Sequence, residues 1–356
     1  MLQIFQPDYD EREENAVISV LRSKWTGLGK KVAEFEAKFA EKVGAKYAVG
    51  VNSCTAALHI ALQLLNIKPG DEVIVPAITF VSTAHAVKFM GATPVFCDVE
   101  KDTLLLDYSD AARRTTTRTK AAIPVLYAGQ PPSPTWKFGC PTVMDAAHAA
   151  GGKWIASDNV ACWSFHAVKN LSTGDGGMIT MNDEGAYERA KRLRWLGIDR
   201  NTWERTDDQR QYWWNYNIDE IGYKYHMNDI TAAIGLVQLD KLDEMQERRL
   251  LAVENYLKTL NGVIELPKVD PTSSWHLFVV RTDKRDDLAV FLRNKGINSG
   301  VHYKPIHLYP CYGKQPELPV AEKEWRRILT LPLYSGIKPA QVDYISDSIK
   351  EWARSQ

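Results

Sequence analysis

One lysine, Lys169, lies in a short segment of hydroxyl-bearing residues and glycines, SFHAVKNLSTGDGG over residues 164–177. A lysine amine can bond to an aldehyde, and hydroxyl and glycine backbone groups can hold a phosphate. Asp145, which opens the sequence Asp-Ala-Ala-His further upstream, could pair with the nitrogen of a pyridine ring. These are the parts of a pyridoxal phosphate (PLP) site. For an isolated lysine, a surface position in a loop would be the better interpretation.

Asp145 ends an apolar run, Val143-Met144-Asp145, and His148 follows it closely. A carboxylate at the end of a buried strand is costly unless it has a partner. A protonated pyridine nitrogen would be such a partner, and the carboxylate would keep it charged. The alternatives are that Asp145 caps a helix and that His148 is a satisfied core histidine.

Two further segments follow strand-like runs. In Asn52-Ser53-Cys54-Thr55, the hydroxyls and the free N–H groups of a helix start suit a phosphate, although Ser53 or Thr55 would more simply be a helix N-cap. Phe80 follows another such run, and its ring could stack on a planar cofactor. Without the other motifs, Phe80 would be interpreted as a core residue.

The elements that must position these residues alternate along the chain. Between about Lys46 and Met181, short apolar runs alternate with helical patterns, which predicts an α/β fold with a mostly parallel central sheet. Ligands bind such sheets at the carboxyl ends of the strands, where Asp145 and the Asn52–Thr55 turn lie. The predicted strands are 47–51, 72–76, 93–98, 121–126, 141–145 and 177–181, with helices at 55–65 and 81–90.

The C-terminal third of the chain has a different sequence pattern. A long helical pattern over 229–256 is expected to cross from a large domain to a smaller α+β domain. Within the latter, the patterns predict a strand at 274–281, a helix at 285–295, a strand or edge at 297–303 and a final helix near 341–353. The predicted domains are therefore residues 1–240, with the N-terminal segment, and residues 241–356.

Composition narrows the class of protein. In these 356 residues, 44 basic residues balance 44 acidic ones, which gives no support to a nucleic-acid or membrane-surface role. We expect no signal peptide and no membrane span. The five cysteines are widely spaced, which predicts reduced thiols in a cytoplasm, and no pair has the spacing of metal ligands, so no metal site is predicted.

Taken together, the motifs resemble those of the DegT/DnrJ/StrS family of sugar aminotransferases, which are PLP enzymes of fold type I, the aspartate aminotransferase fold. The resemblance covers nearly the whole chain, and several ordered motifs are more specific than any one of them. The motifs lie at residues 25–29, 51–59, 76–80, 91–96, 145–149, 164–177, 222–227 and 300–307.

The resemblance implies a role for each cofactor residue. Lys169 would form the Schiff base and, once displaced by a substrate amine, act as the base that moves a proton. Asp145 would pair with the pyridinium nitrogen, Phe80 would stack on the ring, and His148 would contact the cofactor near its 3′ oxygen. The phosphate would be bound by Cys54, Thr55 and Ser164, and Ser53 beside them is a further cofactor-binding candidate.

The resemblance also implies a homodimer with shared active sites. The segment 222–227 of the partner subunit would reach the cofactor, and either Lys224 or His226 would meet the phosphate where many relatives carry asparagine. The residues expected to border the substrate are Trp25, Thr26, Gly27, His302, Tyr303 and His307. Only 15 residues separate Gly129 from Asp145, so a helix that covers the sheet is expected to be trimmed.

The function predicted in this way is ping-pong transfer of an amino group from L-glutamate to a keto-sugar, most simply a nucleotide-linked keto-deoxysugar. The alternatives are a PLP-dependent sugar dehydratase, which would carry histidine in place of Lys169, a keto-cyclitol aminotransferase, and a non-catalytic regulatory member. The nucleotide, the carbon aminated and its stereochemistry stay open. The aromatic segment 203–216 could pack on a base or sugar, or it could form a dimer contact. Four nearby arginines could bind a pyrophosphate or lie on a solvated face: Arg194, Arg200, Arg205 and Arg210.

Overall fold

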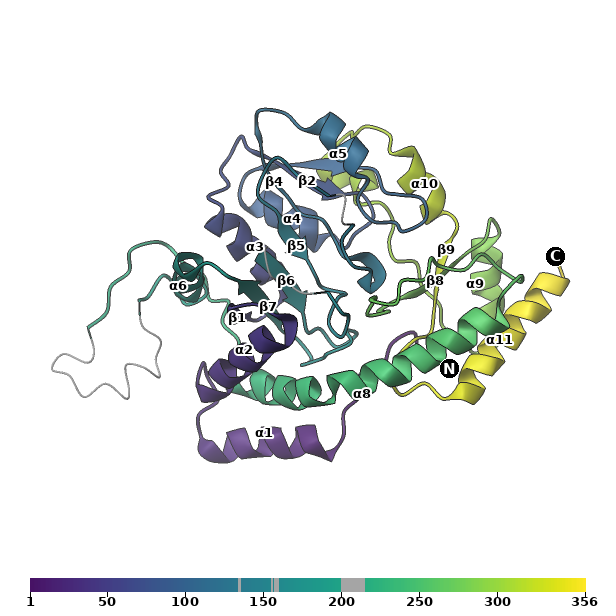
Figure 1. Cartoon of the computed structure of the whole chain (residues 1–356), viewed down its shortest axis with the longest axis horizontal. Helices are drawn as coiled ribbons and strands as arrows, with labels where there is room; N and C mark the ends of the chain where they lie inside the picture. Colours follow the sequence, from purple (N-terminus) through teal and green to yellow (C-terminus); the bar gives the residue numbers. More distant parts are fainter. Residues whose placement is uncertain (134–135, 155, 157–159, 200–214) are drawn as a thin grey trace.

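A twisted central sheet forms the middle of the molecule (Figure 1). The computed structural model describes all residues except 134–135, 155, 157–159 and 200–214. Two ladders, β1-β7-β6-β5 and β3-β2-β4, are joined by backbone bridges between Ala122 and Thr142 and between Val125 and Asp145. The strands are β1 (Tyr47–Val51), β2 (Glu72–Pro76), β3 (Thr93–Cys97), β4 (Thr119–Ala122), β5 (Val143–Asp145), β6 (Val160–Ser164) and β7 (Gly177–Met181).

The sheet is mostly parallel, as predicted. Strand β2 runs parallel to β3 and β4, and β5 runs parallel to β6, whereas β7 is antiparallel to both of its neighbours, β6 and β1. The predicted strand at 121–126 is shorter, since β4 ends at Ala122 and the chain continues through Pro124, which has no N–H to donate. The carboxyl ends of β1, β2, β5 and β6 therefore meet along one edge of the sheet.

Helices cover both faces of the sheet. On one face, α3 packs on strand residues such as Val49 and Ile179, and α4 packs on β2 and β3. On the other face, Phe39 of α2 packs on Trp163 and Phe35 packs on Phe165, and α8 closes this layer. This division between the two faces follows from the two-residue period of a strand. The helices here are α1 (Glu11–Ser23), α2 (Lys30–Val43), α3 (Cys54–Leu64), α4 (Ser82–Phe89), α5 (Tyr108–Arg114), α6 (Glu184–Leu193) and α8 (Asp229–Thr259), with a 3₁₀ turn, η1 (Tyr127–Gly129).

The long helix α8 runs from beneath the sheet into the C-terminal part of the chain, where α11 packs against it (Figure 1). Strands β8 and β9 pair antiparallel there, and a separate core surrounds Tyr256 and Phe278. The predicted division after residue 240 lies inside α8 and stays a prediction. The elements of this part are β8 (Phe278–Arg281), β9 (Ile328–Leu331), α9 (Arg285–Asn294), η2 (Ile306–Leu308), η3 (Pro310–Tyr312), α10 (Pro319–Trp325) and α11 (Pro339–Arg354).

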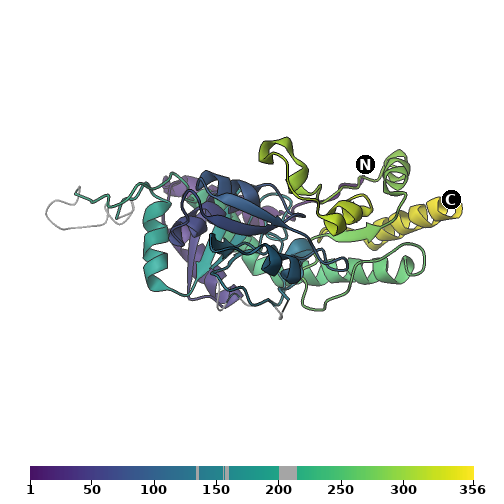
Figure 2. The same cartoon turned by 90° about the horizontal axis from the view of Figure 1, so that it is seen from above.

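Both termini lie on the C-terminal side of the molecule (Figure 2). The Leu2 amide donates to the Gly296 carbonyl at 2.8 Å, and the Leu2 carbonyl accepts from Asn298 at 3.0 Å. The segment predicted as a strand or edge at 297–303 forms no strand; it makes only single bridges, at Ile297 with Leu2 and at Gly300 with Thr330. The first residues of the chain thus belong to the packing of the C-terminal part.

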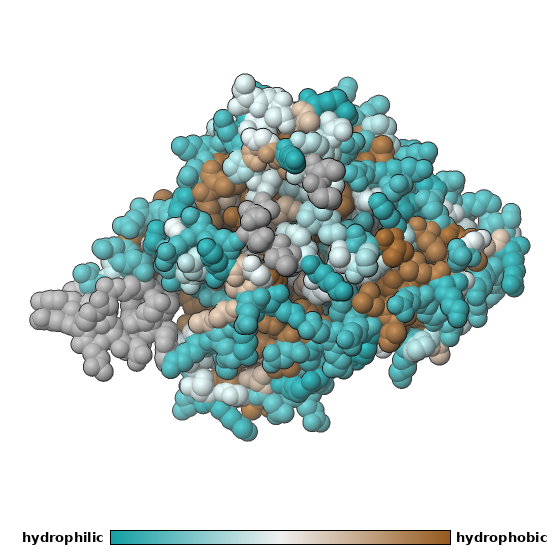
Figure 3. Space-filling model, in the orientation of Figure 1, coloured by the Kyte–Doolittle hydropathy of each residue, from teal (hydrophilic) through white to brown (hydrophobic). Residues whose placement is uncertain are grey.

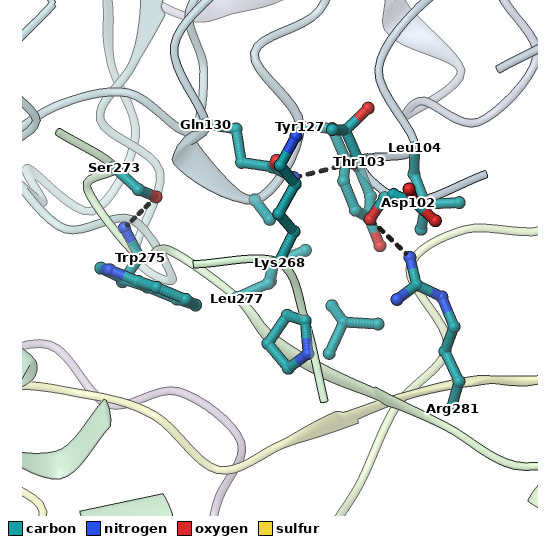
Figure 4. Close-up of a pocket in the computed structure, with 13 residues that line it drawn as sticks. Asp102, Thr103, Leu104, Tyr127, Gln130, Lys268, Ser273, Trp275, Leu277 and Arg281 are labelled. Carbon is teal, nitrogen blue, oxygen red and sulfur yellow. Dashed lines mark hydrogen bonds between the residues drawn. The ribbon is translucent and has the colours of Figure 1, made fainter. Parts of the chain in front are cut away.

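The two parts meet at a polar junction near Arg281 (Figure 4). Its guanidinium donates to the carbonyls of Lys101 and Asp102 at 3.2 and 3.0 Å, and the Gln130 amide donates to the Thr103 carbonyl at 2.7 Å. The cavity at this junction measures about 20 Å³, which is room for about one water molecule. The junction is therefore a structural contact and no substrate site.

The short connection between Gly129 and Asp145 contains no helix in its described residues, which agrees with the expected trimming. Instead, Trp136 and Phe138 pack on the apolar cluster around Ile74 and Leu106. All five cysteines are free thiols, as predicted.

The face drawn in Figure 3 is mostly hydrophilic, with apolar residues gathered in patches between the charged ones. Among the described residues, no helix is both long and apolar enough to cross a membrane.

Candidate active site

A cavity of about 380 Å³ opens at the carboxyl edge of the sheet, between β5, β6 and the start of α3. This volume lies in the range of small-molecule sites. The cavity brings together ten of the predicted site residues, which come from segments far apart in the chain: Ser53, Cys54, Thr55, Phe80, Asp145, His148, Ser164, Lys169, His302 and Tyr303.

Lys169 projects into this cavity from the connection between β6 and β7. The next residue anchors the connection, because the Asn170 side-chain amide donates to the carbonyls of Ala150 and Ser274 at 3.1 and 2.9 Å. Burial lowers the pKa of the Lys169 amine to about 8, against a smaller opposing effect of the Asp145 carboxyl. Lys169 is therefore a cavity residue with an appreciable neutral, nucleophilic fraction, and the interpretation as a surface lysine is wrong.

Asp145 ends β5 with its side chain 5% exposed. Its Oδ2 accepts a hydrogen bond from the Thr83 hydroxyl at 2.8 Å, and its Oδ1 accepts from the Ala147 amide at 3.2 Å. Thr79 supports Thr83 through a bond of 2.8 Å between the two hydroxyls. Burial raises the pKa of Asp145, since these two neutral donors compensate only part of the lost hydration. Asp145 begins a turn and caps no helix.

The start of α3 forms one wall of the cavity. The Ser53 hydroxyl accepts from the Ala56 amide at 3.1 Å, so Ser53 is the N-cap that the simpler interpretation expected, and it also lines the cavity. The amides of Cys54 and Thr55 at this helix start suit an anion. The Thr55 hydroxyl forms a hydrogen bond of 2.8 Å with that of Ser82, and Ser164 lines the same cavity. These groups fit a phosphate.

Comparison with known proteins agrees with this geometry. The model of the DegT/DnrJ/EryC1/StrS aminotransferase family matches residues 7–350. The chain belongs to this aminotransferase family.

Solved structures of similar proteins match over the whole chain. The PMP form of Spr1654 from Streptococcus pneumoniae is 30% identical, with a TM-score of 0.91 and 100% of each chain covered; a PLP form of the same protein has also been solved. The aminotransferase TlmJ from Streptoalloteichus hindustanus is 34% identical, with a TM-score of 0.90 and coverage of 100% and 99%. The sugar aminotransferase CalS13 from Micromonospora echinospora is 26% identical, with a TM-score of 0.87 and coverage of 99% and 100%.

The cofactor of this aminotransferase is PLP, and the donor set fits it. Asp145 forms no salt bridge with any described residue, so its free lone pairs can take a pyridinium N–H. The helix start at Cys54 would suit the phosphate, and Lys169 would supply the amine for the aldehyde. Phe80 is 57% exposed and lines the cavity, so the alternative of a core phenylalanine is wrong.

A close approach of backbone segments shapes the cavity wall at the start of α3. A Cβ on Gly177 would lie 2.5 Å from the Ser53 carbonyl carbon and 2.6 Å from the Cys54 amide nitrogen. Real Cβ atoms do not approach backbone so closely, so only glycine lets β7 lie this near the start of α3.

We expect Gly177→Ala to weaken PLP binding by tenfold or more, since the added methyl group must push the Cys54 amide out of place. Overpacking of this kind also costs about 1–3 kcal/mol of stability. Titration of the apoenzyme with PLP, followed by absorbance, measures the affinity. Gly139→Ala is the matched control, because nothing lies within 4 Å of its Cβ position. Equal PLP affinity of the two variants would contradict the assignment.

His148 and Tyr303 form a hydrogen bond whose direction can be assigned. The Ala128 amide donates to His148 Nδ1 at 3.2 Å, and burial holds the pKa of His148 well below its usual value. The neutral ring therefore carries its proton on Nε2, which donates to the Tyr303 hydroxyl at 3.3 Å. The Tyr303 proton then points elsewhere and can serve an acceptor in the cavity. His148 is thus both a satisfied buried histidine and a cavity residue.

Several residues that support the site escaped the sequence analysis. Thr83 donates a hydrogen bond to Asp145, and Asn170 anchors the connection that carries Lys169. The centroids of the His276 and His148 rings lie 4.3 Å apart. The His276 Nδ1 lies 3.1 Å from Asn170 Oδ1. The sequence signal was present only for Thr83, which comes in the first turn of a predicted helix after a strand. The others meet the site only through tertiary packing.

Six predicted site residues lie outside the cavity of their own chain. Trp25, Thr26 and Gly27 precede α2, and the Gly27 carbonyl accepts from the Asp229 amide at 2.8 Å. The Lys224 ammonium lies 3.5 Å from the centre of the Trp195 ring, and the His226 ring packs on the same indole. His307 is buried beside Phe96 and lies 3.2 Å from Glu322. Their roles stay predictions.

Arg194 neither lies on a solvated face nor is free to bind a pyrophosphate. It is buried, and its guanidinium pairs with Glu36 and donates to the Gly50 carbonyl at 2.8 Å. Arg200, Arg205, Arg210 and most of the aromatic segment 203–216 lie outside the described residues.

Proposed function

We propose that this aminotransferase moves an amino group from L-glutamate to the keto group of a nucleotide-linked keto-deoxysugar, in two half-reactions. The observation that carries the proposal is one cavity with Lys169, Asp145 and a phosphate-binding helix start along its walls. The family supports amino transfer, and the similarity to CalS13, a sugar aminotransferase, supports a sugar as acceptor. The retained Lys169 disfavours a dehydratase, which would carry histidine.

Each residue of the site has its own part in the proposed reaction. Bound PLP supplies an electrophilic aldehyde and a ring that accepts electrons. Lys169 Nζ would hold the aldehyde of bound PLP, and as a free amine it would take a proton from the α-carbon of the donor. Its lowered pKa suits both roles, because a neutral amine is the reactive form. Asp145 would hold the proton on the ring nitrogen, and the start of α3 would bind the phosphate.

We also propose that the active unit is a cytoplasmic homodimer. Among the described residues that line the cavity, Lys169 is the only lysine and there is no arginine, so the carboxylates of the donor lack strong cationic partners from the same chain. Lys224 and His226, remote from their own cavity, are available to a second copy. Exposed apolar residues on the same segment, including Ile218 and Ile221 (87% exposed), support an interface there.

The five free cysteines support a reducing compartment.

The lowered pKa of Lys169, about 8, predicts how cofactor attachment depends on pH. Only the neutral amine attacks an aldehyde, and its fraction rises about tenfold per pH unit below the pKa. We expect the rate at which apoenzyme bonds PLP to rise about tenfold from pH 6 to pH 7 and to level off above pH 8. Stopped-flow absorbance measures this rate, with Nα-acetyl-lysine as the control amine. An enzyme rate that climbs with the control to pH 10 would be inconsistent with the lowered pKa.

The proposed function is tested by two additions to the purified, PLP-loaded protein. L-Glutamate is expected to shift the absorbance of the bound cofactor from its aldehyde form to its amine form and to release 2-oxoglutarate. A nucleotide-linked keto-deoxysugar is then expected to restore the first spectrum and yield an aminated sugar, detected by mass spectrometry. No response to glutamate would refute the donor. Restoration by a keto-cyclitol, with none by nucleotide-linked sugars, would refute the acceptor.

A further inference from the structure

The segment that precedes α1 passes the active-site cavity and reaches the connection between β6 and β7. We call residues 5–10 the N-terminal strap. At one end of the strap, Phe5 lines the cavity, and its ring stacks on that of His276 with centroids 5.4 Å apart and planes 10° apart. Near the other end, the Tyr9 hydroxyl lies 2.6 Å from that of Ser172, which belongs to the connection. The strap therefore contacts both a wall of the cavity and the segment that carries its lysine.

Ser172 is buried, with 1% of its surface exposed, and it is held by three hydrogen bonds. In addition to its bond with Tyr9, the Ser172 hydroxyl accepts from the Gly174 amide at 3.2 Å. Its own amide donates to Gln238 Oε1 on α8 at 3.4 Å. Together with the bonds of Asn170, these contacts anchor the connection at two places just after its lysine.

The Gln238 side chain joins Ser172 to the N-terminal strap, and its orientation is fixed. Its Nε2 donates to the Asp8 carbonyl and to Glu13 Oε1, both at 2.7 Å. Because the amide nitrogen is needed for these two acceptors, the amide oxygen faces the Ser172 amide. Every polar atom of this side chain, which is 1% exposed, therefore has a partner.

A buried cation holds the strap beside this glutamine. Lys241 lies about one turn further along α8, and its side chain is 2% exposed. Its ammonium donates to the Asp8 carbonyl at 2.9 Å, to Asp10 at 2.9 Å and to Glu13 at 3.0 Å. A buried ammonium requires such partners. The residues on either side of Tyr9 are thus fixed to α8.

We propose that the N-terminal strap is a positioning element of the active site, in which Tyr9 and Gln238 hold the lysine connection at Ser172. The inference rests on the role proposed for Lys169 and adds the residues that keep its amine in place. A nucleophile that is already held close to its attacking geometry loses less freedom on the way to the transition state. The Asn170 anchor is independent of the strap, whereas the Ser172 anchor depends on it.

The test is the rate at which full-length apoenzyme bonds PLP, measured by stopped-flow absorbance. Tyr9→Phe, which removes only the hydroxyl, is expected to slow this rate about fivefold. Its thermal unfolding midpoint should stay within a few degrees of wild type. Ser172→Ala is expected to be at least as slow, and the double variant no slower than Ser172→Ala, because both changes remove the same bond.

Tyr344→Phe is the matched control. This tyrosine is 47% exposed, compared with 43% for Tyr9, and its hydroxyl donates to the Lys295 carbonyl at 2.9 Å, outside the cavity. The control is expected to bond PLP at the wild-type rate. Gln238→Met removes the second link and is expected to slow the reaction about tenfold.

The outcomes separate the strap from the proposed function. If Tyr9→Phe bonds PLP as fast as wild type, or if Tyr344→Phe slows the reaction equally, the role of the strap is overturned, even where Gln238→Met fails to fold. A lowered midpoint with an unchanged rate would also overturn it, since that is the result of a purely structural contact. The reaction with PLP needs neither glutamate nor a sugar, so a wild-type enzyme that transfers no amino group would refute the proposed function and leave the strap standing.

Discussion

Lys169→Ala is expected to reduce amino transfer by about 10³-fold or more, because the variant loses both the covalent attachment point and the base that moves the proton. The fold is expected to survive. Lys169 makes no salt bridge with the described residues, and the connection that carries it is held by Asn170 rather than by the lysine side chain. Removal of an amine whose pKa is lowered by burial also removes a desolvation cost.

Three measurements check this expectation: the steady-state rate with glutamate and acceptor, the absorbance band of lysine-bound PLP, and the thermal unfolding midpoint. The band should disappear while the midpoint stays within a few degrees of wild type. Added methylamine should restore part of the proton transfer, which a structural role of Lys169 would not allow. Lys153→Ala, at an exposed lysine, is the matched control. Full activity of Lys169→Ala would refute the site.

Much of the sheet could be predicted from sequence because its strands are short apolar runs that end at polar residues. Strands 47–51, 72–76 and 177–181 have the predicted bounds. The helix α2 was also readable, since Val32, Phe35, Phe39 and Val43 recur at helical spacing, yet it was not predicted. The early end of the strand at Ala122 was readable from Pro124, whereas the absence of a strand at 297–303 depends on tertiary hydrogen bonds, which a single segment does not encode.

The predicted site residues differ in the same way. Asp145, Lys169 and the Ser53–Thr55 turn follow strands of one sheet, so topology alone brings them together at its edge. His302 and Tyr303 reach the cavity from the C-terminal part, and only the family motif indicated them. The protonation state of the His148–Tyr303 pair depends on one backbone amide, that of Ala128, which no pattern in the sequence reveals.

Asp145→Asn is expected to separate activity from stability. The variant keeps the size of the side chain but no longer holds a proton on the ring nitrogen, so we expect kcat to fall by about 10²–10³-fold, as when other fixed electrostatic partners are removed. The apoprotein should not be destabilised. The pKa of Asp145 is raised in the folded state, so this group favours the fold below the unfolded pKa of about 3.9, and that contribution is lost as the pH rises through the folded pKa.

At pH 8 the wild-type apoprotein therefore holds a buried carboxylate with two neutral donors and no salt bridge to a described residue, and its replacement by Asn is expected to raise the unfolding midpoint by about a few degrees. This difference should shrink as the pH falls, because the wild-type carboxyl, whose pKa is raised by burial, then takes up a proton. Saturating PLP should then stabilise wild type more than the variant, because only wild type offers the ring nitrogen a charged partner. Thermal unfolding of both proteins at pH 5 and pH 8, with and without PLP, measures each difference, and Asp240→Asn, at an exposed position on α8, is the control. A variant that loses both activity and apoprotein stability would identify Asp145 as a structural residue. A buried carboxylate that serves the cofactor destabilises the apoprotein, whereas a carboxylate that serves the fold stabilises it.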